Sequence, residues 1–314
     1  MHLESCRELK RTLFDSPTPL TAAVDIPWLG LGITLTPSGE YSLAVRVAEA
    51  GPAAAVLSRI TAEARDEVDI VEVGHIRALS SPTPEDLQGR HRPLVPGVSV
   101  GHPAITAGTL GAFAVVDGAV HILSNNHVLG DSGAAQVGDA ALQPGSADGG
   151  ADPGDAVARL TAMAPLSDDQ PNVVDAAIAR LDDGIGDDPA AYPDGPIAGV
   201  TPWPPTETDV SKVGRTTAHT SGRITAFEVD GLQVDFGGRV LTFDDQVEIS
   251  GSGGAFSDGG DSGSLIWTTE GRLAVGLLFA GSSSGGPDGT GLTFANPIQR
   301  VLDAFGAQLV ESEA

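Results

Sequence analysis

The most constraining feature of this chain is how often its backbone is interrupted by helix-breaking residues. It contains 41 glycines and 22 prolines among 314 residues, and only 4% of its residues are aromatic. Glycine and proline destabilise helix interiors more than any other residues, and both favour turns. Such a composition is typical of many short strands joined by turns rather than of a helical bundle. We therefore predict a mostly β fold, in a chain long enough for about two domains.

One glycine-rich turn carries a serine with the setting of a nucleophile. The segment Gly260-Asp261-Ser262-Gly263-Ser264 directly precedes an apolar run at 265–267. A serine between glycines on a tight turn projects its hydroxyl outward, while neighbouring backbone N–H groups converge on the carbonyl that it attacks. The hydroxyl is too weakly acidic to attack an amide unaided, so this interpretation requires a histidine base and an orienting carboxylate. Taken alone, the segment could also be an ordinary glycine-rich turn.

Both partners are present upstream of the serine. His127 lies in a short polar turn at the end of the strand-like run 119–124. Asp175 directly precedes an apolar stretch, whereas the other acids of 165–195 lie in polar, turn-like sequence. Asp175 is therefore the acid that we expect to be buried, and a buried carboxylate needs a partner. Singly, His127 could be a structural histidine and Asp175 a turn or capping carboxylate.

The order of the three residues separates the serine hydrolase classes. Chymotrypsin-like double barrels have the order His, Asp, Ser, whereas subtilisins have Asp, His, Ser and α/β-hydrolases have Ser, Asp, His. Only the first order fits His127, Asp175 and Ser262. The nucleophile elbow Gly-x-Ser-x-Gly of α/β-hydrolases is absent as well, because Ser264 stands where its second glycine would be.

Several motifs give the chain a resemblance to a known family over roughly residues 92–310. It resembles the chymotrypsin-like (trypsin-like) serine peptidases through 126–128, 175–178 and 260–263. More narrowly, it resembles a prokaryotic member of the Nal1-like branch, which is named for the plant narrow-leaf protein. The motifs that carry this second likeness are Leu123-Ser124-Asn125-Asn126-His127, Gly214-Arg215-Thr216-Thr217, Gly276-Leu277-Leu278-Phe279-Ala280-Gly281 and Ala295-Asn296-Pro297-Ile298.

The resemblance implies a serine endopeptidase that hydrolyses a protein or peptide substrate through an acyl-enzyme on Ser262. His127 would take the proton of Ser262 and Asp175 would fix the tautomer of His127, while the N–H groups of Gly260 and Ser262 would form the oxyanion hole. Residue chemistry supports the same roles. Two alternatives remain open: a catalytically idle trypsin-fold binding or regulatory protein, and an esterase that uses the same triad.

Substrate contacts are also carried over from the family. Its members pair the substrate backbone with the strand after the nucleophile turn, so Leu278, Phe279 and Ala280 are expected to bind substrate here. Counting six residues back from Ser262 gives Phe256 in the specificity pocket, which argues against a preference for Lys or Arg.

Asp261 is expected to need an internal partner. In zymogens of the family, a newly cleaved N-terminus pairs with the acid directly before the serine. Because about 90 residues precede the predicted barrels without an evident cleavage site, we expect Asp261 to bond instead to Arg215 or to backbone amides.

The predicted architecture is a chymotrypsin-like double six-stranded β-barrel with a small N-terminal α/β module and a C-terminal helix. Residues 1–85 would form the module, for docking or oligomerisation, and 86–96 a linker. Residues 97–196 would form the first barrel, with His127 and Asp175, and 197–314 the second barrel, with Ser262. Periodicity predicts a first helix from Leu3 to Leu13, strands at 29–36 and 41–47, a helix at 53–64, a strand at 68–73, and a closing helix whose apolar stripe comprises Ile298, Val301, Leu302, Phe305 and Leu309.

Charge and cysteine content limit the partners. The formal net charge of −25 repels nucleic acid and anionic membranes, so we expect neither as a partner. No apolar run is long enough to span a membrane. We expect no cofactor. We also expect no metal, because aspartate pairs such as Asp182-Asp183 and Asp187-Asp188 lack the spacing of a calcium-binding loop. One cysteine and no recognisable secretory signal favour a cytoplasmic location, and the Nal1-like resemblance implies a possible homo-oligomer.

Overall fold

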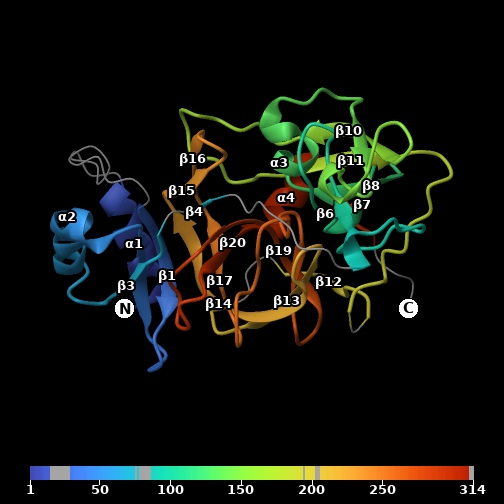
Figure 1. Ribbon diagram of the computed structural model, residues 1–314. Helices are drawn as coiled ribbons and strands as arrows, with labels where there is room; N and C mark the ends of the chain where they lie inside the picture. The colour runs from blue at the N-terminus through green and yellow to red at the C-terminus, as the bar shows by residue number, and fades with distance from the viewer. Residues whose placement is uncertain (15–28, 75, 78–85, 194, 202–205, 311–314) are drawn as a thin grey trace.

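The fold is mostly β, as predicted. The computed structural model describes residues 1–14, 29–74, 76–77, 86–193, 195–201 and 206–310 (Figure 1). The helices of these residues are α1 (Leu3–Phe14), α2 (Ala50–Glu63), α3 (Asn126–Leu129) and α4 (Ile298–Phe305), with short 3₁₀ turns η1 (Asp86–Gln88), η2 (Asp131–Gly133) and η3 (Ser146–Asp148). The helix predicted from Leu3 is therefore confirmed as α1. No helix in the described ranges is long and apolar enough to cross a membrane.

Six strands close into a barrel in the C-terminal half. In pairing order they are β13 (Asp209–Gly214), β14 (Ala218–Asp230), β17 (Gln246–Gly251), β20 (Leu292–Pro297), β19 (Leu273–Ser282) and β18 (Leu265–Thr268), and β18 pairs back onto β13. Apolar side chains such as Ile224, Ile249 and Ile266 fill the interior. This is the second barrel, and the turn that carries Ser262 leads into β18.

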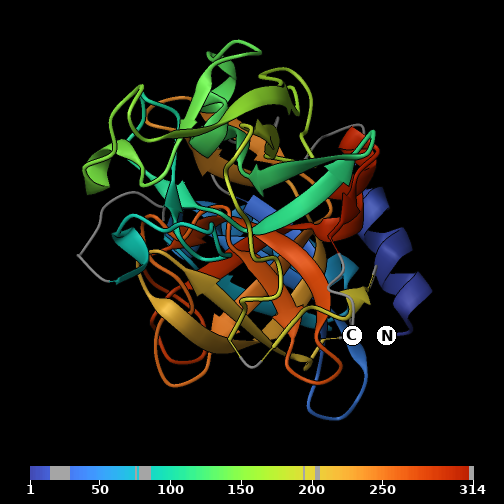
Figure 2. The ribbon, with the colours of Figure 1, turned by 90° about the vertical axis from the view of Figure 1, so that its right-hand side faces the viewer.

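The preceding half, together with a short strand from beyond α4, forms a second six-stranded sheet, which faces the viewer in Figure 2. Its strands, in order, are β21 (Gln308–Leu309), β7 (Ala112–Val116), β8 (Ala119–Ser124), β11 (Ala177–Leu181), β10 (Ala156–Met163) and β9 (Ala140–Leu142). A two-stranded sheet of β5 (Ser99–Val100) and β6 (Gly108–Thr109) joins it through a bridge between Gly101 and Leu142. His127 follows β8 and Asp175 precedes β11, so their neighbouring strands bring them to the same end of the sheet.

The closing helix is shorter than predicted. α4 ends at Phe305 because Gly306 adopts a left-handed conformation with a φ of 59°, which terminates helices. The chain then forms β21, in which Leu309 pairs with Ala114 of β7, so its placement in the helix was wrong. The apolar face of α4 does not pack on the second barrel alone: Ile298 and Val301 share a core cluster with residues of both barrels.

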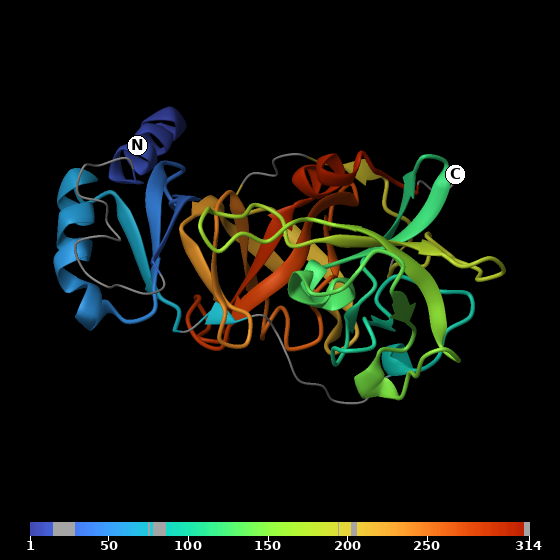
Figure 3. The ribbon, with the colours of Figure 1, turned by 90° about the horizontal axis from the view of Figure 1, so that it is seen from above.

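The N-terminal residues add strands to the second barrel. The predicted hairpin is confirmed as β1 (Leu29–Leu35) and β2 (Tyr41–Val47), and α2 leads to β3 (Val68–Glu72), which is parallel to β2. β1 pairs with the far end of β14, so the sheet runs continuously from the barrel into this unit (Figure 3). Arg46 of β2 also donates to both carboxylate oxygens of Glu248 on β17, at 2.5 and 2.8 Å, with each side chain at most 3% exposed.

Four small strands complete the topology around the second barrel. β15 (Leu232–Asp235) and β16 (Val240–Phe243) form a hairpin between β14 and β17. β4 (Ile76–Arg77) pairs with both β15 and β19, and β12 (Gly199–Val200) runs parallel to the start of β19.

Candidate active site

His127 is held in the turn that follows β8. Its two preceding asparagines are fully buried and tie this turn to the neighbouring chain: Asn125 donates to the carbonyl oxygen of Asp175 and Asn126 to that of Ala164, both at 2.7 Å. Because Nδ2 of each asparagine binds a backbone carbonyl of a neighbouring segment, the turn has little freedom to move. The polar run before His127 is therefore a support for the imidazole.

His127 and Asp175 are in direct contact. Nδ1 of His127 lies 2.5 Å from Oδ2 of Asp175, and the backbone N–H of His127 donates to Oδ1 at 3.1 Å. Asp175 is completely buried and His127 is 11% exposed. A carboxylate oxygen accepts hydrogen bonds, so Nδ1 is the donor of this contact, and in the neutral imidazole with that tautomer Nε2 is an acceptor. This arrangement prepares Nε2 to act as a base.

Asp175 is positioned from the second barrel. Its backbone N–H donates to Oδ1 of Asn296 at 2.9 Å, and Nδ2 of Asn296 donates to Oε1 of Gln246 at 2.7 Å. All three side chains are buried. β20, which contains Asn296, thereby fixes a residue of the first barrel. The motif Ala295-Asn296-Pro297 was part of the family resemblance, but this role of Asn296 was not predicted.

The turn around Ser262 requires its glycines. Gly260 and Gly263 have φ values of +92° and +94°, a conformation that other residues rarely adopt. A side chain at Gly263 would also lie 2.1 Å from Oγ of Ser124 and 2.3 Å from the carbonyl oxygen of Thr109. The turn is fastened to β6 because the N–H of Thr109 donates to the carbonyl oxygen of Ser262 at 2.8 Å.

Ser262 and Val128, the residue after His127, both lie against β6. A side chain at Gly108 would meet the methyl groups of Val128, which follows His127, and the carbonyl oxygen of Ser262 at 2.9 Å. The hydroxyl of Ser262 and Nε2 of His127 do not form a hydrogen bond, and both are buried without a partner among the described residues. The structure thus joins two of the three predicted residues by a hydrogen bond and leaves Oγ of Ser262 and Nε2 of His127 unpaired. Buried polar atoms without partners are uncommon, and they often mark functional sites.

The expected internal partners of Asp261 are confirmed in part. Its fully buried carboxylate accepts hydrogen bonds from the backbone N–H groups of Thr216, Thr217 and Asp258 at 2.9, 3.2 and 3.0 Å. Nζ of Lys212, which is also fully buried, lies 3.2 Å from Oδ2 of Asp261. The amide prediction is confirmed, whereas the cation is Lys212 rather than Arg215.

Strand alternation explains why Lys212 replaces Arg215 as the partner. A side chain at Gly214 would lie 2.5 Å from Oδ1 of Asp261, so this face of β13 points toward Asp261. Lys212 is two residues earlier and shares that face. Arg215 is the next residue along, and it binds Asp148 of η3 instead, with Nη2 2.5 Å from Oδ1.

An aromatic side chain that sequence analysis missed contacts His127. The ring of Phe236, from the turn between β15 and β16, meets the imidazole edge-on with centroids 5.6 Å apart. Phe236 also stacks on Phe243, which lies 4.7 Å from Phe279 of β19. No motif marks Phe236, because the contact depends on where the hairpin is placed.

The residues expected to bind substrate are largely covered. Phe256 is 2% exposed and its ring packs in the core of the second barrel together with Leu278. Phe279 and Ala280 have no exposed surface and belong to the neighbouring core cluster. Only the backbone of β19 is therefore suited to meet a peptide at these positions. No group of three histidine, cysteine, aspartate or glutamate side chains in the described ranges is arranged to hold a metal ion.

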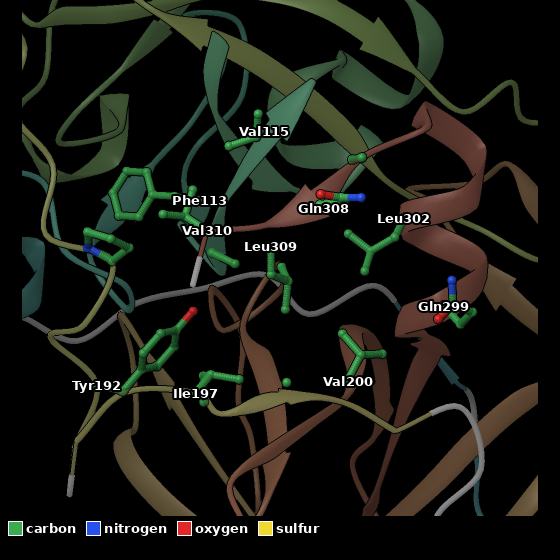
Figure 4. A pocket seen from close by; sticks show the side chains of 14 residues that line it. Phe113, Val115, Tyr192, Ile197, Val200, Gln299, Leu302, Gln308, Leu309 and Val310 are labelled. Atoms are coloured by element: carbon green, nitrogen blue, oxygen red, sulfur yellow. The ribbon is translucent and has the colours of Figure 1, made fainter. Parts of the chain in front are cut away.

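A cavity of about 650 Å³ opens away from these residues (Figure 4). It lies between β7, the segment around Tyr192 and the chain after α4, and most of the residues that line it have apolar side chains. The hydroxyl of Tyr192 donates to the carbonyl oxygen of Gly111 at 2.8 Å, and burial raises the pKa of this phenol far above its usual value. None of His127, Asp175 and Ser262 lines this cavity.

Comparisons with known proteins relate this geometry to a fold. No family model and no curated protein matches the sequence. Among solved structures, the chain is similar to a glutamic-acid-specific serine protease that uses a histidine triad in substrate binding, with 18% identity and a TM-score of 0.50 over 69% of this chain and 100% of that one. It is also similar to Thermobifida fusca protease A (17% identity, TM-score 0.49, 69% and 98% covered) and to Cellulomonas bogoriensis chymotrypsin (18%, 0.47, 69% and 98%). The first likeness confirms the predicted chymotrypsin-like fold.

Proposed function

We propose that this protein is a serine endopeptidase whose nucleophile is Ser262. The observation that carries the proposal is the buried bond between Nδ1 of His127 and Asp175, which leaves Nε2 without a partner, while the neighbouring Val128 and the carbonyl oxygen of Ser262 both lie beside Gly108 of β6. Structural neighbours that are serine proteases support a protease-type activity with protein or peptide substrates.

The residues suggest the following course of reaction. The hydroxyl oxygen of Ser262 attacks the substrate carbonyl carbon as His127 Nε2 takes its proton, and the N–H groups of Gly260 and Ser262 stabilise the oxyanion. The imidazolium, stabilised by Asp175, then gives the proton to the leaving amine, and the C–N bond breaks. Water activated by His127 hydrolyses the acyl-enzyme and releases Ser262.

Labelling with a fluorophosphonate probe tests the proposal. The wild-type protein should be labelled at Ser262, and Ser262→Ala and His127→Ala should lower turnover by about 10⁴- to 10⁶-fold while the fold is kept. Ser211→Ala removes another buried serine, on β13, and should react like wild type. A Ser262→Ala variant that cleaves peptides as fast as wild type would refute the assignment.

A second candidate is a trypsin-fold binding protein with an idle triad. The missing hydrogen bond between Ser262 and His127 favours it. Such a protein would not react with the probe, which separates the two functions directly. An esterase with the same triad would react, and a screen of peptides against esters would identify it.

Finer assignments follow from the resemblance and the sequence. We place the chain in the Nal1-like branch of prokaryotes, in the cytoplasm and as a homo-oligomer, with residues 1–85 as a docking or oligomerisation module. The single cysteine, Cys6, is buried and unpaired, which fits a reducing compartment. Light scattering of the full chain tests the oligomer, and imaging of a tagged chain in its own cell tests the location.

A further inference from the structure

One side chain outside the predicted triad binds the peptide group between Gly259 and Gly260, whose N–H is a predicted oxyanion donor. Oγ1 of Thr216 donates to the carbonyl oxygen of Gly259 at 2.5 Å. In a trans peptide the C=O and the following N–H point in opposite directions. The N–H of Gly260 is therefore turned away from Thr216, and among the described residues it donates to no protein acceptor.

Thr216 is itself oriented by a buried ion pair between the two barrels. Nη1 of Arg215 lies 3.3 Å from Oγ1 of Thr216, so the threonine oxygen accepts a hydrogen bond from the guanidinium. Its own hydroxyl proton is then directed to the carbonyl oxygen of Gly259. Asp148 holds the guanidinium through two hydrogen bonds of 2.8 and 2.5 Å. The side chains of Arg215 and Asp148 are 1% and 4% exposed, and charge-assisted hydrogen bonds are strong in such surroundings.

We propose that Thr216 is a positioning residue for the oxyanion hole, with Asp148 and Arg215 as its support. The proposal rests on the proposed function. Without the hydroxyl, the peptide between Gly259 and Gly260 can rotate, and the N–H of Gly260 no longer meets the charge that develops on the substrate oxygen. Because that charge exists in the transition state, the loss should appear in kcat rather than in KM.

The test compares Thr216→Val with Thr216→Ser, after the wild type has been shown to react with the fluorophosphonate. Thr216→Val should lower kcat by about 10- to 100-fold, somewhat less than deletion of an oxyanion donor, with KM nearly unchanged. The inhibition constant of a peptide aldehyde should rise by the same factor, and Thr216→Ser should restore most of the turnover. Asp148→Asn should give a smaller effect of the same kind. Thr268→Val is the matched control, because Thr268 is equally buried and its hydroxyl also bonds to a carbonyl.

Two results would overturn this inference while leaving the proposed function intact. One is a Thr216→Val variant with wild-type kcat and aldehyde inhibition. The other is a loss of activity in Thr216→Val and Thr216→Ser alike, with a matching loss of thermal stability, which would show that Thr216 only supports the fold.

A second inference concerns the edge of β19 that β18 leaves uncovered beside Ser262. β18 covers this edge only as far as Leu277, and from there the Ser262 turn adjoins it: Gly263 donates to the carbonyl oxygen of Leu278 at 2.8 Å. The opposite edge is held by β20 as far as Gly281, which pairs with Thr293. β18 therefore leaves the first edge of β19 uncovered next to Ser262.

β4 pairs with this edge of β19, beyond the end of β18. Ile76 and Arg77 pair antiparallel with Ser282 and Gly281, and the backbone of Arg77 also pairs with Asp235 of β15. Because β20 already holds the other side of Gly281, β4 must lie on the side of the nucleophile turn. The side chain of Ile76 is 1% exposed and packs in the cluster that contains Phe279.

We infer that β4 competes in cis with extended peptide substrates. The inference rests on the proposed function, in which the substrate residues before the scissile bond pair with β19. A peptide long enough to reach Gly281 must displace Ile76 and Arg77, whereas a short ester need not, since Gly281 is three residues, or roughly 10 Å, beyond Leu278.

The variant Ile76→Asp places a charge in the apolar cluster and should release β4. We expect KM for a peptide with four residues before the scissile bond to fall by about fivefold or more, and hydrolysis of a one-residue ester to stay unchanged. Ile76→Ala should act in the same direction with less disturbance of the fold. Val229→Ala, a change in the same cluster on β14, is the control and should leave KM unchanged.

Hydrogen exchange gives a readout that does not depend on catalysis. Release of β4 should speed exchange of the backbone amides at Gly281 and Ser282 in both Ile76 variants and not in Val229→Ala. If the wild type hydrolyses the ester but peptide KM and exchange at β19 stay unchanged in the Ile76 variants, the inference is wrong and the proposed function still stands.

Discussion

Replacing Lys212 by methionine should lower stability and displace the turn that carries Ser262. Lys212 and Asp261 are each 0% exposed, so the variant leaves a buried carboxylate without its counter-charge. Removing one member of a buried pair costs about 3–5 kcal/mol. Because Asp261 keeps hydrogen bonds from Thr216, Thr217 and Asp258, we expect the lower end of this range. At roughly 2–4 °C per kcal/mol, the melting temperature should fall by about 6–12 °C.

The same change should reduce turnover, because Asp261 lies between Gly260 and Ser262 in the chain. A displacement of about 1 Å in such a site can cost about 100-fold in rate. Denaturant unfolding gives the stability and fluorophosphonate labelling the reactivity. The double variant Lys212→Met/Asp261→Asn removes both charges and should be more stable than additivity predicts.

The chain provides a matched control for this experiment. Its other lysine, Lys10, is 6% exposed and lies 2.8 Å from Asp230 in the N-terminal unit. Lys10→Met should lower stability and leave the labelling rate unchanged. The reasoning fails if Lys212→Met unfolds within about 0.5 kcal/mol of wild type and is labelled equally fast, because the pair would then hold nothing in place.

Three further changes probe other parts of the structure. Gly263→Ala should cost about 3 kcal/mol or more in denaturant unfolding, since its side chain would collide with Ser124 in a backbone conformation that alanine avoids; a cost below about 0.5 kcal/mol would contradict this. Asn296→Ala leaves the buried N–H of Asp175 without its acceptor and should lower stability by about 1–3 kcal/mol together with kcat, whereas an unchanged kcat would show that Asn296 does not position Asp175. Burial, aided by neighbouring acids, raises the pKa of Asp244 in the folded state. The folded protein therefore favours the protonated carboxyl group. The stability that this gives is full below the pKa of the unfolded chain and is lost as pH rises through the pKa of the folded protein. The melting temperature of Asp244→Asn relative to wild type should therefore rise from about pH 4 to about pH 7, and a constant or falling difference would refute the shift.

Local patterns were sufficient to predict the elements whose partners lie nearby in the chain. The hairpin of β1 and β2 and the helix α1 follow from alternation and helical spacing within single segments. The end of α4 was misjudged because Leu309 continues the apolar spacing, while Gly306 and the pairing of β21 with β7 decide where the helix stops.

Site residues divide in a similar way. His127, Asp175 and Ser262 could be selected from the sequence because each stands in a motif and their order is diagnostic. Lys212 could not, since a lone lysine in an apolar strand shows no partner until the register places it over Asp261. The only available signal was that Lys212 and Gly214 share one face of the strand. Phe236 reaches His127 through a hairpin whose position depends on the whole barrel.

The continuity of β14 with β1 has a practical consequence for anyone trimming this chain to its barrels. Cutting before residue 86 would strip the end of β14 and expose unpaired backbone groups, which invite another chain to add a strand. It would also remove Arg46, which leaves the buried carboxylate of Glu248 without its counter-charge. Such a shortened protein should be prone to aggregate, so inactivity in that form would say nothing about its chemistry.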